Sequence, residues 1–309
     1  MRWPTSLTDL HPVRKIPMQR LQVRFLLGIL IGSHCCFTSS LPPQICNNLM
    51  PVLQDNADRQ TKSAASMPRL LVSVRDLPEA ELAIDGGCDI VDIKEPQNGA
   101  LGMASAATIN QIAARCARAN RPSSTALGEV LDWNTEDAES LSLSDELSFA
   151  KLGLAGLSQQ SNWIESWMSV RSFVDSQRDL PLSWIAVAYA DTEAALSPSL
   201  REVLDAAIST NCKGLLIDTT TKRPNGSMLD YVDVEELASV ARIAQENRLL
   251  FAIAGQIGSN QLPATKCVAP DIIAVRSAVC SGFDRQTNVD QSAVALLKRQ
   301  IEKCFANDA

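Results

Sequence analysis

Five charged residues of this sequence lie within or just beyond short apolar segments. They are Asp92 and Lys94 in CDIVDIKEP, Lys151 in FAKLGLAG, and Asp218 and Lys222 in LLIDTTTK. Burial of an amine is costly unless the amine is paired or used, and a buried lysine can form a Schiff base with a carbonyl carbon. These residues therefore indicate carbonyl chemistry on a small substrate.

Histidine, the usual residue for proton transfer, is absent after residue 66, because the two histidines are His11 and His34. Chemistry in residues 67–309 then falls to Lys, Asp, Glu, Tyr or Cys. The cysteines of this region show no C-x-x-C spacing and predict neither a zinc site nor a disulfide framework. We expect reduced thiols and a cytoplasmic protein. These cysteines are Cys88, Cys116, Cys212, Cys267, Cys280 and Cys304.

The charge is distributed unevenly along the 309 residues. Of 28 Lys and Arg and 35 Asp and Glu, seven basic and three acidic residues precede residue 67, so the remainder has 21 basic and 32 acidic residues and a net charge of −11. Such an acidic body is a poor partner for nucleic acid or an anionic membrane. We expect a small-molecule substrate, held by local cations if it is a phosphate. A monomer and a homo-oligomer both stay open.

The first 66 residues form a separate N-terminal extension. Arg20 and Arg24 precede FLLGILIGSHCCF, a run of signal-peptide length that is too short for a membrane span of about 20 residues. Met67 opens directly into a strand-like segment, MPRLLVSVRD. We favour an over-long gene start, with a genuine leader or a disordered tail as alternatives. The predicted catalytic domain is residues 67–309.

Short apolar runs alternate with amphipathic stretches throughout residues 67–309. Apolar runs that are each followed by a helix indicate parallel strands buried on both faces, and eight such units match the size of a (β/α)8 barrel. A doubly wound sheet is the rival, but no G-x-G-x-x-G follows the first strand. The predicted strands are 69–74, 89–94, 124–130, 149–154, 183–190, 214–219, 249–255 and 271–277. Predicted helices include 104–120, 200–211, 234–248 and 291–304, the last with Ala293, Leu296, Leu297 and Ile301 on its core-facing side.

The carboxyl ends of the strands form the catalytic face of such a barrel. Asp92 and Lys94 are two residues apart, so both should face the interior near its mouth, within reach of each other. Asp92 would keep Lys94 protonated, whereas Lys151 and Lys222 could lower its pKa. The alternative interpretation of Asp92 and Lys94 is an ion pair that plugs the barrel.

Other candidates also have structural alternatives. Lys151 lies inside an apolar strand, where it could merely partner an internal acid. Lys222 lies in a loop, where a solvated lysine would look the same. Asp191, after the fifth strand, is a candidate substrate-binding residue, with helix capping as the alternative.

The loops after strands seven and eight are the expected phosphate site, since this fold often binds phosphate there. Gly255 and Gln256 follow strand seven, and Arg276 and Ser277 follow strand eight. Arg276 could supply a fork of N–H groups for phosphate oxygens. With the lysines, these loops suggest a phosphorylated carbonyl compound.

Seven of these segments together resemble the (5-formylfuran-3-yl)methyl phosphate synthases of methanofuran biosynthesis. The most specific is GGCDIVDIKEPQNGALG, which carries D-I-x-D-x-K-x-P-x-x-G-x-L-G. The resemblance implies a (β/α)8 barrel that joins two glyceraldehyde 3-phosphate molecules into a furan aldehyde phosphate. The segments are 70–76, 86–102, 150–156, 188–191, 215–222, 252–255 and 275–285.

By resemblance, Lys94 matches the Schiff-base lysine and Lys151 matches the lysine that moves protons. Asp92, Asp218 and Lys222 match the family's further site residues. Two departures fall in the phosphate loops: the family's A-G-S reads Ala254-Gly255-Gln256 here, and its R-G-A reads Arg276-Ser277-Ala278. The family's acid after strand three appears as the longer Glu129.

The resemblance implies a lyase that needs no cofactor, because the lysine iminium is itself the electron sink. A conventional Schiff-base aldolase acting on triose phosphates is the nearest rival. A catalytically silent barrel that binds a phosphometabolite or a protein belongs to another class, and the retained buried lysines disfavour it.

Overall fold

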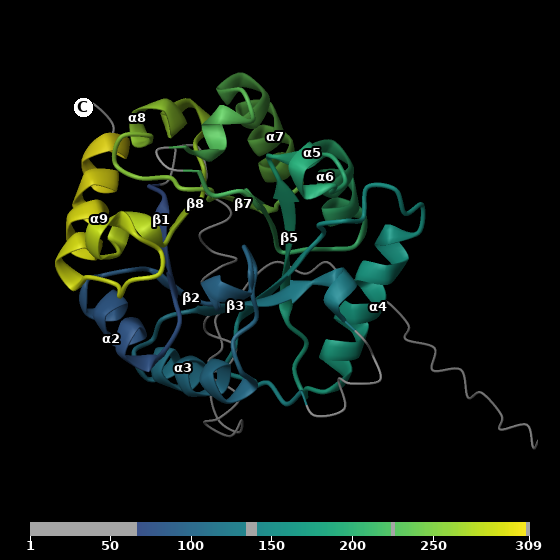
Figure 1. Ribbon diagram of the computed structural model, residues 1–309, viewed down its shortest axis with the longest axis horizontal. Coiled ribbons are helices and arrows are strands. Elements are labelled where there is room, and N and C mark those ends of the chain that lie inside the picture. Colours follow the sequence, from purple (N-terminus) through teal and green to yellow (C-terminus); the bar gives the residue numbers. More distant parts are fainter. Residues whose placement is uncertain (1–66, 134–140, 224–225, 307–309) are drawn as a thin grey trace, which may run out of the picture. The chain divides into compact units, whose positions relative to one another are not determined.

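The computed structural model describes residues 67–133, 141–223 and 226–306. The predictions for residues 1–66 lie outside these residues. Eight parallel strands form a closed barrel in chain order, and β1 pairs with β8 (Figure 1). This closure confirms the (β/α)8 prediction and excludes the doubly wound sheet. The strands are β1 (Arg69–Val74), β2 (Ile90–Ile93), β3 (Ser123–Glu129), β4 (Phe149–Gly153), β5 (Ser183–Tyr189), β6 (Gly214–Asp218), β7 (Leu250–Ile253) and β8 (Ile272–Val275).

Helices surround these strands as an outer ring (Figure 1). Side-chain caps begin several of them: Asp76, Ser105, Ser199 and Asp290 each accept a backbone N–H of the following first turn. No helix of the described residues is long and apolar enough to cross a membrane. The four helices predicted by range are confirmed as α3, α6, α7 and α9. The helices are α2 (Leu77–Asp85), α3 (Ala106–Arg118), α4 (Trp163–Ser176), α5 (Thr192–Ala195), α6 (Leu200–Ser209), α7 (Val234–Glu246), α8 (Leu262–Thr265) and α9 (Gln291–Phe305).

The buried face of α9 differs from the prediction at one residue. Val294, Leu297 and Ile301 are buried, whereas Leu296 is 50% exposed. Leu296 and Leu297 are about 100° apart on a helix of 3.6 residues per turn, so both cannot face the core squarely. The stripe formed by Val294, Leu297 and Ile301 faces the barrel instead.

Alternation along each strand separates two apolar layers. In β2, Val91 and Ile93 belong to the layer beneath the helices, while Ile90 belongs to the barrel interior. Side chains two apart face the same side of a strand, so Asp92 also faces inward. The same alternation places a polar residue in the inward row of several strands. These residues are Ser73, Asp92, Ser124, Lys151 and Asp218.

Candidate active site

The inward polar residues line a cavity of about 280 Å³ at the carboxyl ends of the strands. This volume is near the lower end for ligand pockets and suits a small substrate. Nine of the ten residues predicted for the site line this cavity; the tenth, Asp191, does not. The nine are Asp92, Lys94, Lys151, Asp218, Lys222, Gly255, Gln256, Arg276 and Ser277.

Asp92 on β2 and Lys151 on β4 form a buried ion pair across the cavity. The Lys151 amine contacts Oδ1 of Asp92, and the two side chains are only 4% and 3% exposed. The same amine donates to Oγ of Ser124 at 3.1 Å, and Oγ of Ser73 donates to Oδ2 of Asp92 at 3.0 Å. Hydrogen bonds of this kind offset the cost of burying both charges.

Lys94 does not form an ion pair with Asp92, which excludes the alternative of a plug formed by these two residues. Its amine lies just beyond the end of β2 and donates to the carbonyl oxygen of Ala100 at 3.3 Å. Burial lowers the pKa of Lys94 to about 8; the negative charges of Asp218 and Asp92 oppose this decrease, and the nearby cations of Lys222 and Lys151 add to it. A neutral amine, the form that attacks carbonyls, is therefore accessible near neutral pH.

Lys222 folds back onto the strand end from which its loop begins. Its amine donates to Oδ1 of Asp218 at 2.9 Å, to the carbonyl of Thr219 at 2.6 Å and to Oγ1 of Thr219 at 3.0 Å. These contacts contradict the alternative of a freely solvated lysine. Burial alone would raise the pKa of Asp218, but the charges of Lys222 and Lys94 keep that pKa below its usual value, so Asp218 remains an anion.

Gln256 and Gly255 brace the loop after β7 against the loop after β6. The Gln256 amide makes two hydrogen bonds to Arg223, accepting from its backbone N–H at 3.0 Å and donating to its carbonyl at 2.9 Å. Gly255 has a φ of +77°, and a Cβ there would lie 2.7 Å from Cβ of Met228. Gln256, which stands where the family motif has serine, therefore links the two loops.

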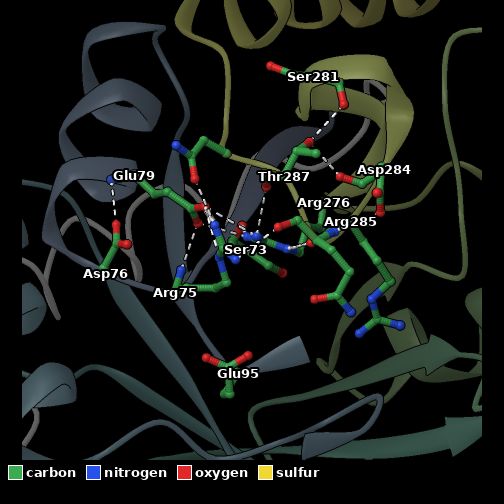
Figure 2. A network of polar contacts seen from close by, with 12 residues as sticks. Ser73, Arg75, Asp76, Glu79, Glu95, Arg276, Ser281, Asp284, Arg285 and Thr287 are labelled. Atoms are coloured by element: carbon green, nitrogen blue, oxygen red, sulfur yellow. Dashed lines mark hydrogen bonds and ion pairs between the residues drawn. The ribbon is translucent and has the colours of Figure 1, made fainter. Parts of the chain in front are cut away.

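Arg276 lines the cavity, but protein atoms accept all of its N–H groups (Figure 2). Nη1 donates to the carbonyl of Ser73 and to Oε2 of Glu79, both at 2.9 Å. Nη2 donates to Oε1 of Glu79 at 3.2 Å and to the carbonyl of Thr287 at 3.3 Å, and Nε donates to the carbonyl of Arg285 at 2.7 Å. A guanidinium has five N–H groups, so Arg276 has none left for the predicted phosphate contact and acts as a brace instead.

Asp191 is also a brace rather than a cavity residue. Its carboxylate accepts from the backbone of Thr220 at 2.9 Å, the hydroxyl of Thr220 at 2.8 Å and the backbone of Thr221 at 2.7 Å. It makes no side-chain cap to α5, which excludes the capping alternative. Asp191 instead fixes the start of the loop that carries Lys222.

Several polar residues were not among the sequence predictions for the site. Arg223 and Arg285 line the cavity, as do the hydroxyl-bearing Ser73 and Ser124. Arginines in exposed loops have no periodic signal in the sequence, and the serines would have needed the inward register of β1 and β3.

Glu129, which the resemblance identified as the acid after strand three, also forms buried contacts. It accepts from the Tyr189 hydroxyl at 2.5 Å and from the backbone N–H of Ala155 at 2.9 Å. Burial raises the pKa of Glu129, although these hydrogen bonds oppose the increase. The carboxyl group is thus held in place beside the strand ends.

A (β/α)8 barrel with three lysines and two aspartates in the cavity at its carboxyl face is an enzyme architecture. Residues 70–298 match the family described as 4-HFC-P synthase, and the chain belongs to that family. A relative from Archaeoglobus fulgidus, named (5-formylfuran-3-yl)methyl phosphate synthase, is 28% identical over 75% of this chain and 99% of its own. One of the same name from Methanocaldococcus jannaschii is 30% identical over 74% and 97%. The solved structure of KGPDC from Streptococcus mutans is 10% identical with a TM-score of 0.51, over 78% of this chain and 100% of its own, and shares the fold.

Proposed function

We propose that this protein is a lyase that condenses two glyceraldehyde 3-phosphate molecules into (5-formylfuran-3-yl)methyl phosphate through a Schiff base on Lys94. The reaction releases one inorganic phosphate and two water molecules, which accounts for every atom of both substrates and needs no oxidant or reductant. The proposed role in the cell is methanofuran-type biosynthesis. The names of the curated relatives support this assignment.

The chemical state of Lys94 carries the proposal. Its pKa of about 8 and its neutral hydrogen-bond acceptor make the unprotonated amine available inside a small cavity. That amine adds to the aldehyde carbon of one triose phosphate, and loss of water gives an iminium ion. The iminium acidifies the adjacent C–H bond and takes up the electron pair when the proton leaves.

Lys151 and Asp92 are placed to move the protons of these steps. Lys151, in its ion pair with Asp92, first acts as an acid toward the departing hydroxyl of the carbinolamine. Having lost its proton, Lys151 can then act as the base that removes the acidified C–H proton. Asp92 stabilises the ammonium form at the beginning and end of this exchange.

Asp218 and Lys222 supply further fixed charges near Lys94. Anionic Asp218 stabilises the iminium cation as it forms, and Lys222 is held against Asp218 by the 2.9 Å contact. The electron pair of the resulting enamine can expel phosphate from the neighbouring carbon or form the carbon–carbon bond to the second triose phosphate, in either order. Loss of a further C–H or O–H proton supplies the electron pair for the other step. Cyclisation and loss of water give the aromatic ring, which makes the overall reaction effectively irreversible.

The assignment is tested by mass spectrometry of the intact protein after incubation with glyceraldehyde 3-phosphate and borohydride. We expect one adduct on Lys94 and, without borohydride, ultraviolet absorbance of a furan aldehyde. Lys94→Arg should abolish both, because a guanidinium stays protonated. Lys303→Arg is the matched control, since Lys303 is exposed on α9 and lies outside the cavity lining.

Other outcomes would redirect the assignment. An adduct on Lys94 without furan absorbance would identify a conventional Schiff-base aldolase. Near-normal turnover by Lys94→Arg would show that another group is the nucleophile. A folded protein that forms neither adduct nor furan would contradict the proposed reaction.

A further inference from the structure

We propose that Arg285 binds a phosphate group at the mouth of the cavity. A cluster of Glu79, Arg75 and Arg276, the Glu79 clamp, holds Arg285 in position. The binding of an anion follows from the geometry of Arg285 itself. Its identification as the phosphate of a triose phosphate rests on the proposed function. Arg285 takes the phosphate-binding role that the sequence predicted for Arg276, because the N–H groups of Arg276 are all engaged by the protein.

Arg285 is a partly buried cavity residue whose guanidinium is only partly satisfied. Its Nη2 group donates to the carbonyls of Gly99 at 3.2 Å and Pro96 at 3.5 Å. Its Nε and Nη1 groups have no acceptor among the residues that the structure describes. In Figure 2 the side chain extends away from the cluster around Glu79. Unused N–H groups on a cation that lines a cavity are suited to bind a phosphate oxygen.

The Glu79 clamp explains how a residue from an irregular loop is held in place. Glu79 is 2% exposed, and its carboxylate binds both Arg276 and Arg75, each within 3.0 Å (Figure 2). The two arginines then donate to the backbone of the loop after β8: Arg276 to the carbonyls of Arg285 and Thr287, and Arg75 to the carbonyl of Gln286. Three consecutive carbonyl groups are thus fixed from one buried carboxylate.

The contacts of Arg285 also place it next to the proposed nucleophile. Its guanidinium binds the carbonyl of Gly99, and the adjacent carbonyl of Ala100 accepts the hydrogen bond from Lys94. A phosphate on Arg285 would therefore lie beside the loop that orients the amine. Asp284, the nearest acid in sequence, is exposed and its Oδ1 accepts from the backbone of Gln286. The acids whose charges reach Arg285 are Asp218 and Glu95, and neither forms an ion pair with it among the described residues.

The test measures binding of inorganic phosphate by titration calorimetry, which does not depend on turnover. Arg285→Gln should weaken phosphate binding by about tenfold or more, as expected for loss of a charge-assisted hydrogen bond. Arg242→Gln, on the exposed face of α7 beside Glu246, is the matched control and should bind normally. Unchanged affinity in Arg285→Gln, or no phosphate binding by the wild type, would overturn the anion site.

A second variant tests the clamp without removing its buried carboxylate. Arg75→Gln should raise KM for glyceraldehyde 3-phosphate while kcat changes by less than about threefold. In the Arg285→Gln background it should have no further effect on phosphate affinity, because its contribution passes through Arg285. Additive effects would contradict the positioning role. Arg285-dependent phosphate binding without furan formation would refute the proposed function but leave the anion site intact.

Discussion

Lys94 should produce a rising limb near pH 8 in the pH profile of kcat/KM, which reports groups of the free enzyme. At pH 7, a pKa of about 8 leaves about one-tenth of the amine neutral. The ordinary value of 10.5 would leave only about 0.03% neutral, so the site raises the reactive fraction roughly 300-fold. This gain corresponds to about 3 kcal/mol.

Removal of the anion or of the cation of the Asp218–Lys222 pair near Lys94 should move that limb in opposite directions. Asp218→Asn removes a charge that favours the protonated amine, so the limb should move to lower pH. Lys222→Met removes a cation that disfavours protonation, so the limb should move to higher pH. Both variants should lower kcat, which makes the direction of the pH shift the informative quantity. Arg242→Gln on α7 serves as the unshifted control.

The assay follows furan absorbance at low substrate concentration from about pH 6 to about pH 10.5. Borohydride trapping of the Lys94 adduct gives a parallel profile for the first step alone, using short incubations because triose phosphates decompose in base. A limb near 10.5 in both profiles would refute the inference that burial activates the amine. Shifts of Asp218→Asn and Lys222→Met in the same direction would refute the electrostatic explanation.

Substitutions at four positions test the stability consequences of the site. Folding lowers the pKa of Lys94 from 10.5 to about 8, so the charge of this amine opposes folding fully below pH 8 and not at all above pH 10.5. Lys94→Met should therefore raise the unfolding free energy at pH 7 by roughly 2–3 kcal/mol. Urea titrations should show this gain decreasing between pH 8 and pH 10.5. Asp92→Asn should lower the unfolding free energy by roughly 3–5 kcal/mol, because Lys151 is left buried without its ion-pair partner. Adding Lys151→Met in the double variant should recover part of this loss. Fully additive effects of the two substitutions would contradict the ion pair. Gly255→Ala should lower the unfolding free energy by about 1–3 kcal/mol, because Gly255 has a φ of +77° and an added Cβ would meet Met228. Thermal unfolding measures this effect, and an unchanged Tm would show that the loop relaxes.

The barrel and its strands could be predicted because the sequence marks them in two independent ways. Continuous apolar runs show burial on both faces, and their regular spacing with helical stretches predicts parallel strands. Lys151 could be assigned to the interior for the same reason, since it interrupts such a run at an inward position. Leu296 could not be placed correctly, because the sequence of α9 alone does not show which of two adjacent leucines faces the barrel.

The partners of the charged residues could not be predicted, because they depend on contacts between distant segments. Asp92 is two residues from Lys94 in sequence, yet its ion pair is with Lys151, which β4 brings across the cavity. Arg276 has the sequence context of a phosphate ligand, but Glu79 and the loop after β8 occupy its donors. Residue type and motif indicate that a cation is present; only the fold shows whether its N–H groups are still available.

The three cavity lysines illustrate how location, rather than residue type, assigns chemical roles. Lys151 and Lys222 each contact an aspartate in a buried or partly buried ion pair. Among the residues that the structure describes, Lys94 has no carboxylate partner, and its hydrogen-bond acceptor is the neutral carbonyl of Ala100. The two ion pairs bring cations near Lys94 that partly offset the effect of their own aspartates on its pKa. Burial lowers the pKa of this amine to about 8, and a neutral amine is what a Schiff-base mechanism requires.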